Sequence, residues 1–490
     1  MLLLKTLIKN KYNFINLYLI FFILFFSLWI KKEFGGHIHY IEIIYNFYIN
    51  YEGLVNSPSI IKYNFFLYVI NLSFFFSILS FFILEKLKKK NFSKIKFKNR
   101  YLKKIIKVFF LDIKIYLLYS ILFFLINFKF HYLILPYVNV FNTNFDNNLY
   151  FEANKINFKN PKKFKNLILI YIESLEYDIE NLTNEINENP LQNLNQISGK
   201  NIYDFKEMPS AQISIAGLIA SQCSIPFHPT ISTNLKDYKL KKLFCLSDVL
   251  NQFEYEQYYF MTVNKKFQRT DYFKENHHYK IFDNKEIRKV YTNVNFGWGE
   301  GVHDNIMLNF AKKKIYDLHK NKRKFNVVIK TTDTHPPYQK VSEICKIDNK
   351  MDIKKKSALS FKCISSLVSD FLDDLSLNGI LDDTVVVIMG DHLTHPYYND
   401  KAIIDESRNK RNIYFKMNTS KKFNRKKMNH FDVAPTILDE LGFLNHNQKR
   451  FAFGVSLFQN NEKFNYNKHY NSVMSKKILN DFYLSKLLSK

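Results

Sequence analysis

Hydrophobic residues in the first third of the chain form long runs without charges. The run 12–30 holds 19 uncharged residues and the run 63–84 holds 22. A third run, 108–128, carries Asp112 and Lys114 near its start and is strongly apolar after them. In a helix, at about 1.5 Å per residue, runs of this length approach the roughly 30 Å hydrocarbon core of a bilayer. We therefore predict three membrane-spanning helices at 12–30, 63–84 and 108–128.

Two alternatives concern this region. The first run could be a cleaved signal peptide, but it is long and no small-residue cleavage site follows it. The segment 37–51 is apolar but short and contains Glu42, so we interpret it as lying at the membrane interface. If this segment crosses the membrane, the number of spans changes.

Basic residues orient the predicted helices. The segment 85–107 carries eleven Lys and Arg residues, and Lys5, Lys9 and Lys11 precede the first run. Loops rich in Lys and Arg stay in the cytoplasm. With three spans, the chain after about residue 130 then lies outside. We predict a transmembrane region at 1–137 with a basic cytoplasmic loop at 85–107, a linker at 138–164, an outer catalytic domain at 165–460 and a C-terminal tail at 461–490.

The hydrophobic pattern changes from about residue 160 onward. Short apolar runs rich in β-formers, at 167–172, 327–329 and 384–389, alternate with longer segments of helical period such as 360–377. Apolar strands that alternate with helices indicate an α/β domain, in which helices cover both faces of a mainly parallel sheet. Ligands of such sheets bind beyond the carboxyl ends of the strands.

Polar residues follow all three predicted strands. Glu173 comes after the first, the segment Thr331–Pro337 after the second, and Asp391 and His392 after the third. Carboxylates and an imidazole that converge on one edge suit a divalent ion such as Mn²⁺ or Zn²⁺. Ser214 opens a further helical segment, where it is either an ordinary N-cap or a hydroxyl placed beside a bound phosphate.

Charge and cysteine content narrow the function. The 490 residues carry a formal charge of +27, and 19 Lys and Arg against 6 Asp and Glu lie in the first 150. Because Lys, Asn, Ile and Phe are in excess all along the chain and no basic motif has a base-reading context, we predict no nucleic-acid partner. The four cysteines, Cys223, Cys245, Cys345 and Cys363, all follow the predicted spans. Disulfides form in oxidising compartments, and the local pairing 223–245 and 345–363 is the simplest of three; free buried thiols are the alternative.

Four segments together resemble the membrane-anchored sulfatase/alkaline-phosphatase superfamily. They are Ile172–Glu176, Ser214–Pro226, Thr332–Pro336 and Gly390–His392. Within the superfamily, the chain is similar to the phosphoglycerol transferases and the lipoteichoic acid synthases over about residues 165–445. The resemblance implies an alkaline-phosphatase/sulfatase-like sheet sandwiched by helices after a helical transmembrane region. It also implies a multi-pass protein of the inner membrane with a periplasmic catalytic domain.

The resemblance assigns roles residue by residue. It implies that Glu173, Ser214, Asp391 and His392 bind one divalent ion, Mn²⁺ or Zn²⁺. Ser214 stands at the nucleophile position, where these relatives have Thr, and His335 matches an active-site histidine near the phosphate. Substrate-binding positions are matched by Asn264, Trp298 and Arg269, although the pocket Arg of the family falls on Thr270, one place after Arg269.

The implied activity is the transfer of phosphoglycerol from phosphatidylglycerol, an anionic phospholipid, through Ser214 to a glycan or other envelope acceptor. Phosphoethanolamine transfer with the same metal and nucleophile is the nearest alternative. A sulfatase-type hydrolase is disfavoured, because Ala216 and Leu218 stand where Pro and Arg of the formylglycine motif would be. A non-catalytic envelope scaffold is a further alternative, which the intact set of predicted ligands argues against.

Overall fold

The computed structural model describes residues 11–34, 65–89, 113–127, 147–209, 211–227, 243–336, 341–348, 350–394, 397–398, 401–404, 410–445, 449–459 and 465–474. They fall into two compact units, one with the described residues up to 127 and the other with those from 147 onward.

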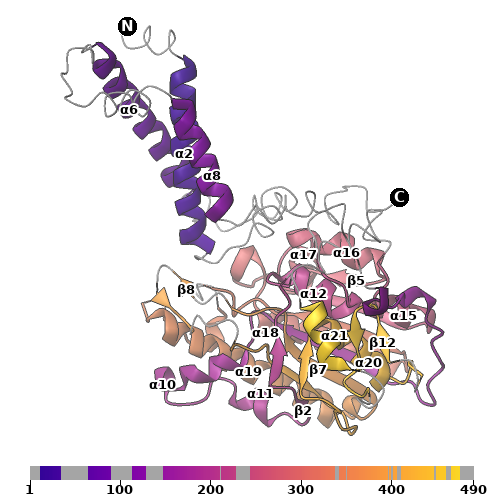
Figure 1. Cartoon of the computed structure of the whole chain (residues 1–490). Helices are drawn as coiled ribbons and strands as arrows, with labels where there is room; N and C mark the ends of the chain where they lie inside the picture. Colours follow the sequence, from indigo (N-terminus) through magenta and orange to yellow (C-terminus); the bar gives the residue numbers. More distant parts are fainter. Residues whose placement is uncertain are drawn as a thin grey trace. The chain divides into compact units, whose positions relative to one another are not determined.

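The described residues of the N-terminal unit form three apolar helical segments, which Figure 1 labels α2, α6 and α8. They are α2 (Lys11–Phe34), a π-helix η2 (Phe65–Asn71) that continues into α6 (Leu72–Lys89), and α8 (Ile113–Asn127). Aromatic rings join them, since Phe14 contacts Phe74 and Phe81, and Phe26 contacts Phe124.

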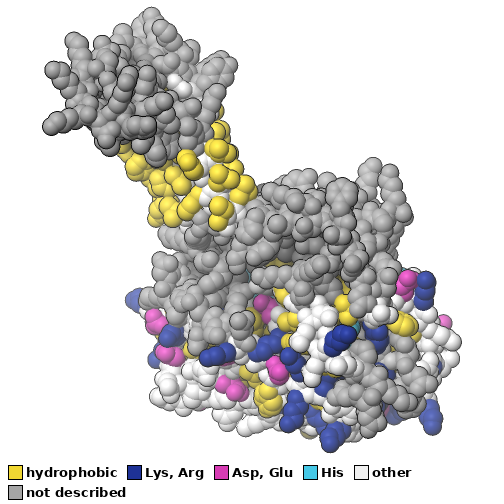
Figure 2. Space-filling view, in the orientation of Figure 1, with side chains coloured by type: hydrophobic (Ala, Val, Ile, Leu, Met, Phe, Trp, Pro, Cys, Tyr) yellow, Lys and Arg dark blue, Asp and Glu magenta, His cyan; other side chains and the backbone are white. Residues whose placement is uncertain are grey.

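Two helices in the described part of the chain are long and apolar enough to cross a membrane, at Asn13–Ile30 and Phe65–Ile83. They coincide with the first two predicted spans. The apolar part of α8 is shorter, at Leu117–Ile126, so the third span stays a prediction. Hydrophobic side chains also cover the outside of these helices (Figure 2), as expected of a surface that faces lipid. The segment 37–51 and the basic loop beyond Lys89 lie outside the described residues, so the orientation also stays a prediction.

The second unit is built on a seven-stranded sheet of order β2-β10-β7-β1-β6-β4-β5. The strands β1 (Asn166–Ile172), β6 (Phe325–Lys330), β7 (Thr384–Gly390), β4 (Glu256–Met261) and β5 (Lys280–Phe282) are parallel. The short strands β10 (Phe415–Met417) and β2 (Lys200–Asn201) extend one edge in antiparallel orientation. All three apolar runs predicted as strands are therefore strands of one mainly parallel sheet.

Helices cover both faces of this sheet. Successive residues of β1 point to opposite faces, so this strand contacts helices on both sides. Ile168, Ile170 and Ile172 belong to a core shared with α18 (Asp304–Lys320) and α19 (Ile353–Leu377). On the other face, the Tyr171 hydroxyl lies 2.7 Å from the Ser221 hydroxyl of α12 (Ser214–Cys223). The predicted α/β fold class is thus confirmed.

The other helices among the described residues of this unit are α10 (Thr183–Ile186), α11 (Gln192–Gln196), α15 (Leu246–Gln252), α16 (Thr270–Asn276), α17 (Asn284–Val290), α20 (Val433–Glu440) and α21 (Tyr466–Val473). The 3-10 turns are η5 (Asn147–Leu149), η6 (Ala153–Lys155), η7 (Tyr177–Leu182), η8 (Phe267–Arg269), η9 (Trp298–Glu300), η10 (Glu343–Cys345), η11 (Ile380–Asp383) and η12 (His430–Asp432). Two-stranded pairs are β3 (Asp204–Lys206) with β11 (Lys427–Asn429), β8 (Tyr397–Tyr398) with β9 (Lys401–Ala402), and β12 (Arg450–Phe451) with β13 (Gly454–Val455).

Described residues at both ends of this unit pack onto it. Phe151 pairs with Ala452 in an antiparallel bridge, and Tyr470 of α21 belongs to a small core with Val455. The packed part therefore extends into the segments predicted as linker and tail. The structure contains two disulfides, Cys223–Cys245 and Cys345–Cys363, which is the local pairing.

Candidate active site

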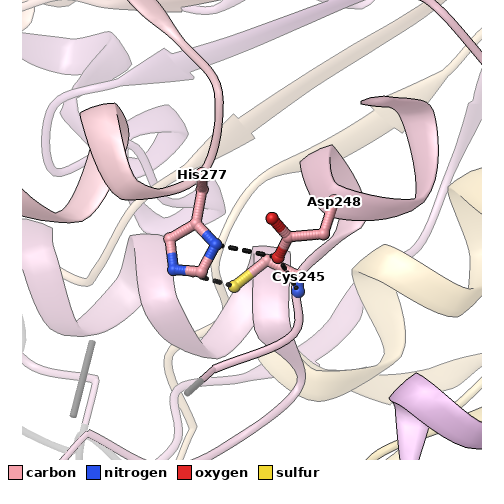
Figure 3. Close-up of side chains that lie close together, drawn as sticks. All are labelled: Cys245, Asp248 and His277. Atoms are coloured by element: carbon pink, nitrogen blue, oxygen red, sulfur yellow. Dashed lines mark hydrogen bonds and ion pairs between the residues drawn. The ribbon is translucent and has the colours of Figure 1, made fainter. Parts of the chain in front are cut away.

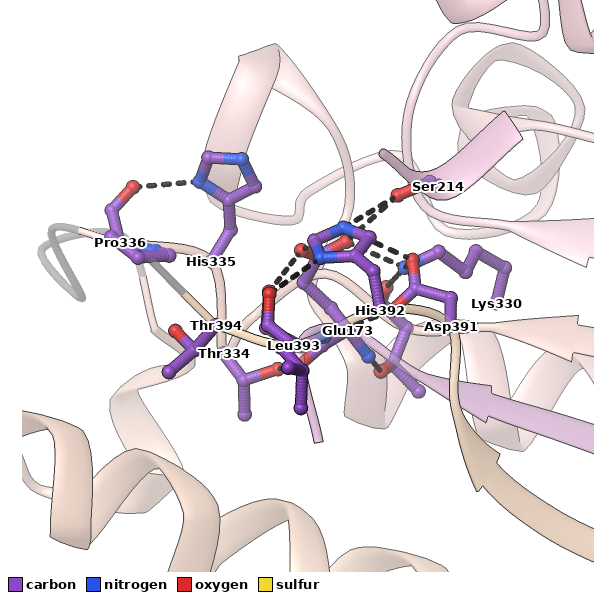
Figure 4. A network of polar contacts seen from close by, with 12 residues as sticks. Glu173, Ser214, Lys330, Thr334, His335, Pro336, Asp391, His392, Leu393 and Thr394 are labelled. Carbon is purple, nitrogen blue, oxygen red and sulfur yellow. Dashed lines mark hydrogen bonds and ion pairs between the residues drawn. The ribbon is translucent and has the colours of Figure 1, made fainter. Parts of the chain in front are cut away.

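The carboxyl ends of three neighbouring strands form the candidate active site (Figure 4). In the sheet register, Tyr171 of β1 is opposite Lys330 of β6, and Ile172 is opposite Gly390 of β7. The residues that directly follow β1 and β7, Glu173 and Asp391, therefore leave the sheet at the same edge. Because all three strands are parallel, their polar ends are adjacent although they are far apart in the sequence.

The four predicted metal ligands converge at this edge. One ligand atom from each of Glu173, Asp391 and His392 can be chosen so that all lie within 4.8 Å of one another. The Ser214 hydroxyl donates a hydrogen bond to Glu173 Oε2 at 3.2 Å and lies 3.5 Å from His392 Nε2. Ser214 is the first residue of α12 and keeps 9% of its surface exposed, whereas the other three are more deeply buried.

A left-handed residue directs Glu173 into the cluster. Ser174, immediately after it, has φ = 58°, a conformation that a serine adopts only at a cost. This turn lets the Ser174 N–H donate to Asp391 Oδ1 at 2.9 Å and its hydroxyl donate to Glu173 Oε1 at 2.7 Å. One serine thus links both carboxylates and sets their mutual orientation.

His392 and Asp391 are also held through the backbone. His392 Nδ1 donates to the Leu393 carbonyl at 2.9 Å, which directs Nε2 toward the carboxylates. Beneath them, His430 Nδ1 accepts from Met208 N–H, so Nε2 donates to the Asp391 carbonyl at 3.0 Å. Burial lowers the pKa of His430 to about 4, in keeping with this neutral, supporting role.

The helix that carries Ser214 comes very close to the Asp391 backbone at Gly217. A Cβ atom at position 217 would lie 2.0 Å from the Asp391 carbonyl oxygen, far inside contact distance. A glycine is therefore needed at this position. Its absent side chain lets the start of α12 lie beside the end of β7.

Lys330, which sequence reasoning missed, lies between the two carboxylates. Its Nζ is 2.6 Å from Glu173 Oε2 and 2.9 Å from Asp391 Oδ2, and it also donates to the Thr331 carbonyl. The available signal was a basic residue at the end of the buried strand FNVVIK. Burial alone would lower the pKa of Lys330, but the Asp391 and Glu173 carboxylates outweigh burial and raise it.

The same charges shift the pKa values of the other members. Burial favours the neutral form of Glu173, yet the charges of Lys330 and His392 hold the pKa of this carboxyl well below its usual range. Burial also opposes the charging of His392, but the Asp391 and Glu173 carboxylates raise the pKa of its imidazole to about 10. The cluster is thus built to hold positive charge between two carboxylates.

This donor set fits a divalent metal ion. Two carboxylates, an imidazole nitrogen and a hydroxyl are ligands that Zn²⁺ and Mn²⁺ accept. Asp391 Oδ2 is buried and has ion-pair contacts with Lys330 and His392, yet it accepts no hydrogen bond of good geometry from the described residues. A buried carboxylate oxygen left in this way is available to a cation.

His335 lies beside this cluster, close enough for the Glu173 carboxylate to favour the charged form of its imidazole. Its Nδ1 donates to the Pro336 carbonyl at 2.7 Å, and Nε2 has no hydrogen-bond partner among the described residues. Burial lowers the pKa of His335, although Glu173 acts in the opposite direction. The lowered pKa favours the neutral imidazole, in which the Nε2 lone pair is available.

Two aspartates fix the segment that carries His335. The Asp304 carboxylate accepts from the Thr332 and Asp333 N–H groups at 2.9 Å, and Asp333 Oδ1 lies 3.2 Å from His303 Nδ1. Burial and the neighbouring Asp333 raise the pKa of Asp304 well above its usual range. Sequence analysis assigned no role to Asp304.

The predicted substrate-binding residues lie on segments that contact the site. Asn264 Oδ1 accepts from the Lys266 N–H at 2.9 Å, a contact within its own loop. Arg269 has φ = 55° and directly follows Gln268, whose side-chain oxygen accepts from the Ile215 N–H at 2.9 Å. Trp298 touches a predicted catalytic side chain, since it stacks on His335.

A family model described as Sulfatase matches residues 165–443, which is more than half of the chain. The chain belongs to the sulfatase family. Two relatives are both called phosphoglycerol transferase I. The one from Escherichia coli (strain SMS-3-5 / SECEC) is 29% identical over 299 residues, and the one from Shigella flexneri is 28% identical over 299 residues. Each alignment covers 58% of this sulfatase-family chain but only 38% of the relative.

The fold of this family member is also seen in a solved structure. The lipoteichoic acid synthase LtaP from Listeria monocytogenes matches it with a TM-score of 0.50 and 18% identity, over 64% of this chain and 80% of that chain. This likeness supports the architecture, the mainly parallel sheet with helices on both faces.

A second cluster of possible metal ligands is not a site in this sulfatase-family protein (Figure 3). Cys245, Asp248 and His277 are close enough to share an ion. However, Cys245 is bonded to Cys223, and Asp248 accepts from the Cys245 N–H and pairs with His277 at 2.8 Å. The three residues are thus committed to the disulfide and to the start of α15.

Proposed function

We propose that the protein is a metal-dependent phosphotransferase of the inner membrane. It moves phosphoglycerol from phosphatidylglycerol, through a covalent intermediate on Ser214, to a glycan or other envelope acceptor in the periplasm. The observation that carries the proposal is the position of the Ser214 hydroxyl, at the start of α12 and within hydrogen-bonding distance of Glu173. Similarity to two proteins called phosphoglycerol transferase I supports the donor.

Glu173, Ser214, Asp391 and His392 would hold one Mn²⁺ or Zn²⁺ ion. Such an ion would lower the pKa of the Ser214 hydroxyl and neutralise charge on the phosphoryl oxygens. The residues themselves orient the nucleophile, because Ser214 is fixed by the close approach of α12 to Asp391. The first turn of α12 contains no acidic residue, so its N-terminal dipole adds favourable potential for an anionic phosphate.

Transfer takes place in two displacements at phosphorus. In the first, Ser214 Oγ, which has already lost its proton to solvent, forms a bond to phosphorus, the bond to the diacylglycerol oxygen breaks, and protonated His335 gives that oxygen a proton. In the second, the acceptor hydroxyl passes its proton to His335 Nε2 and attacks phosphorus, which releases Ser214 as the alkoxide and returns His335 to its protonated form. The neutral imidazole with an available Nε2 suits the second step, and microscopic reversibility gives the protonated form its role in the first.

Apolar helices at the N-terminus support a lipid donor. A donor that stays in the bilayer meets an anchored enzyme at a higher effective concentration than it meets a free one. The helices Asn13–Ile30 and Phe65–Ile83 are long and apolar enough to provide this anchor.

The test uses vesicles that contain labelled phosphatidylglycerol or labelled phosphatidylethanolamine, with purified full-length protein. We expect diacylglycerol release from phosphatidylglycerol by the wild type, its loss in Ser214→Ala and its retention in Ser214→Thr, which keeps a hydroxyl at the start of the helix. Release from phosphatidylethanolamine alone would instead support phosphoethanolamine transfer. No release from either lipid would contradict the proposal and leave the scaffold alternative.

A further inference from the structure

Two exposed apolar side chains lie on segments next to Trp298. Phe296, two positions before Trp298, is 58% exposed, and Ile344 of η10 is 54% exposed. The Asn295 side-chain amide donates a hydrogen bond to Glu343 Oε1. Because Asn295 precedes Phe296 and Glu343 precedes Ile344, the two apolar side chains belong to adjoining segments of the surface.

The loop 291–297, which carries Phe296, is tied down by one arginine of α17. Arg288 donates to the Val294 carbonyl at 2.9 Å through Nη1 and to the Gly301 carbonyl at 2.9 Å through Nη2. Its guanidinium group also lies 4.1 Å from the centre of the Phe296 ring. The structure therefore holds this loop in place while Phe296 remains exposed to solvent.

Trp298 connects this surface to the proposed chemistry. Its ring stacks on His335, the residue that would protonate the leaving diacylglycerol oxygen. The acyl chains of the donor stay in the bilayer while its phosphate reacts, so the surface next to His335 has to meet lipid. Exposed apolar side chains at such a place are typical of a membrane contact.

The charge of α17 suits an anionic lipid surface. This helix carries Lys285, Arg288 and Lys289 against one acid, Glu286, and its last residue, Val290, is 58% exposed. Lys289 pairs with Glu286, so the excess positive charge is that of Lys285 and Arg288. Basic side chains are attracted to anionic phospholipids, and apolar side chains beside them enter the membrane interface.

We propose that the catalytic unit docks onto the bilayer through a lipid-docking surface made of Val290, Phe296, Ile344, Lys285 and Arg288. Its apolar side chains enter the interface and its cations bind anionic headgroups, which brings the phosphate of a membrane lipid to Ser214. The inference rests on the proposed lipid donor and deepens it, because it names the surface through which the donor arrives. It does not depend on whether the headgroup is glycerol or ethanolamine.

Leu377 provides a matched control on the same unit. It ends α19 and is 88% exposed, so it is at least as accessible as Phe296 and Ile344. It comes shortly before β7 begins, whereas the active site lies where β7 ends. An acidic residue at position 377 therefore adds the same charge to the surface away from the site.

The experiment compares two forms of one donor with full-length protein in vesicles. Long-chain phosphatidylglycerol is presented in the bilayer, and dihexanoyl phosphatidylglycerol is presented in water to protein in phosphatidylcholine vesicles. In the double variant Phe296→Asp, Ile344→Asp, we expect the ratio of kcat/KM for the long-chain lipid to that for the short-chain lipid to fall by about tenfold or more, mainly through KM. Leu377→Asp should keep the wild-type ratio. An unchanged ratio in the double variant, as a merely structural loss would give, would overturn the proposal.

Fluorescence quenching gives a second readout that does not require turnover. Trp29 is replaced by Phe, which leaves Trp298 as the single natural tryptophan, and a further indole is introduced by Ile344→Trp or Leu377→Trp. Phospholipids with brominated acyl chains should quench the emission added by Ile344→Trp but not that added by Leu377→Trp. Diacylglycerol release by the wild type without quenching at position 344 would overturn this inference alone. Quenching there without release from any lipid would overturn the proposed function and leave the docking surface.

Discussion

The indole ring of Trp298 stacks on the imidazole ring of His335, with centroids 3.9 Å apart and ring planes at 30°. Trp298 lies in η9, and His335 follows β6 by five positions, so the contact joins two segments that are separate in the sequence. Phe267 packs against Trp298, with the two ring centroids 5.5 Å apart. The stack restricts His335 to one orientation and shields it from water.

Replacement of Trp298 by Ala should move the alkaline limb of the pH profile. Diacylglycerol release needs protonated His335, and burial lowers the pKa of this imidazole below its usual 6.5, so the rate of release should fall as the pH rises through the lowered pKa. Exposing the ring in Trp298→Ala raises this pKa toward 6.5, so the limb moves to higher pH. The measurement is kcat/KM for diacylglycerol release against pH. Trp298→Phe, which keeps an aromatic ring, is the control, and an unchanged limb in the Ala variant would contradict the assignment.

Replacement of His335 by Gln should slow transfer without loss of metal. General acid–base groups contribute about 10² to 10⁴ in rate, so we expect a decrease of that size and the disappearance of the alkaline limb for diacylglycerol release. Bound metal should stay at the wild-type level, because His335 is not one of the proposed ligands. A variant rate within twofold of the wild-type rate would rule out proton transfer by His335, because loss of a general acid–base group should slow the reaction by about 10² or more.

Replacement of Gly217 by Ala should disrupt the site through the backbone. The added Cβ would lie 2.0 Å from the Asp391 carbonyl oxygen, so either α12 or the end of β7 has to move. Overpacking of this kind costs typically about 1–3 kcal/mol of stability. We expect a lower thermal midpoint and loss of most activity. Ala216→Gly, at the adjacent position, should cost only about 1 kcal/mol of helix propensity, and equal activity loss in both variants would contradict this account.

The two disulfides should differ in their effect on catalysis. Cys223 ends the helix that Ser214 begins, and its bond to Cys245 closes 22 residues, whereas Cys345–Cys363 closes 18. Loops of such similar size imply similar stabilisation, about 2–5 kcal/mol each. Double Cys→Ser variants should therefore show comparable losses in thermal midpoint. Activity measured below both midpoints should fall only in the variant that lacks Cys223–Cys245, and an equal fall in both would contradict the coupling of this disulfide to α12.

The sequence predicts the parts of this fold that depend on continuous apolar runs. Such runs marked β1, β6 and β7, and the polar residues after them marked Glu173, Asp391 and His392. The edge strands β2 and β10 are only two and three residues long, so they carry no recognisable pattern. The placement of Ser214 came from a resemblance, because a serine at a helix start is usually a cap.

Lys330 shows why the rest of the site could not be predicted. Its partner Glu173 is 157 positions away in the chain, and the register of β1 against β6 alone brings them together. A lysine at the end of a strand would ordinarily be solvated, so its type gives no sign of burial. The stack of Trp298 on His335 is non-local for the same reason.

The most direct test of the central claim is mass spectrometry of full-length protein incubated with vesicles of phosphatidylglycerol and phosphatidylethanolamine together. Omission of an acceptor lets the intermediate accumulate, because the second displacement then lacks its nucleophile. We predict a phosphoglycerol adduct on the peptide that contains Ser214, and no adduct in Ser214→Ala. An adduct on another residue, or diacylglycerol release by Ser214→Ala at the wild-type rate, would contradict the account.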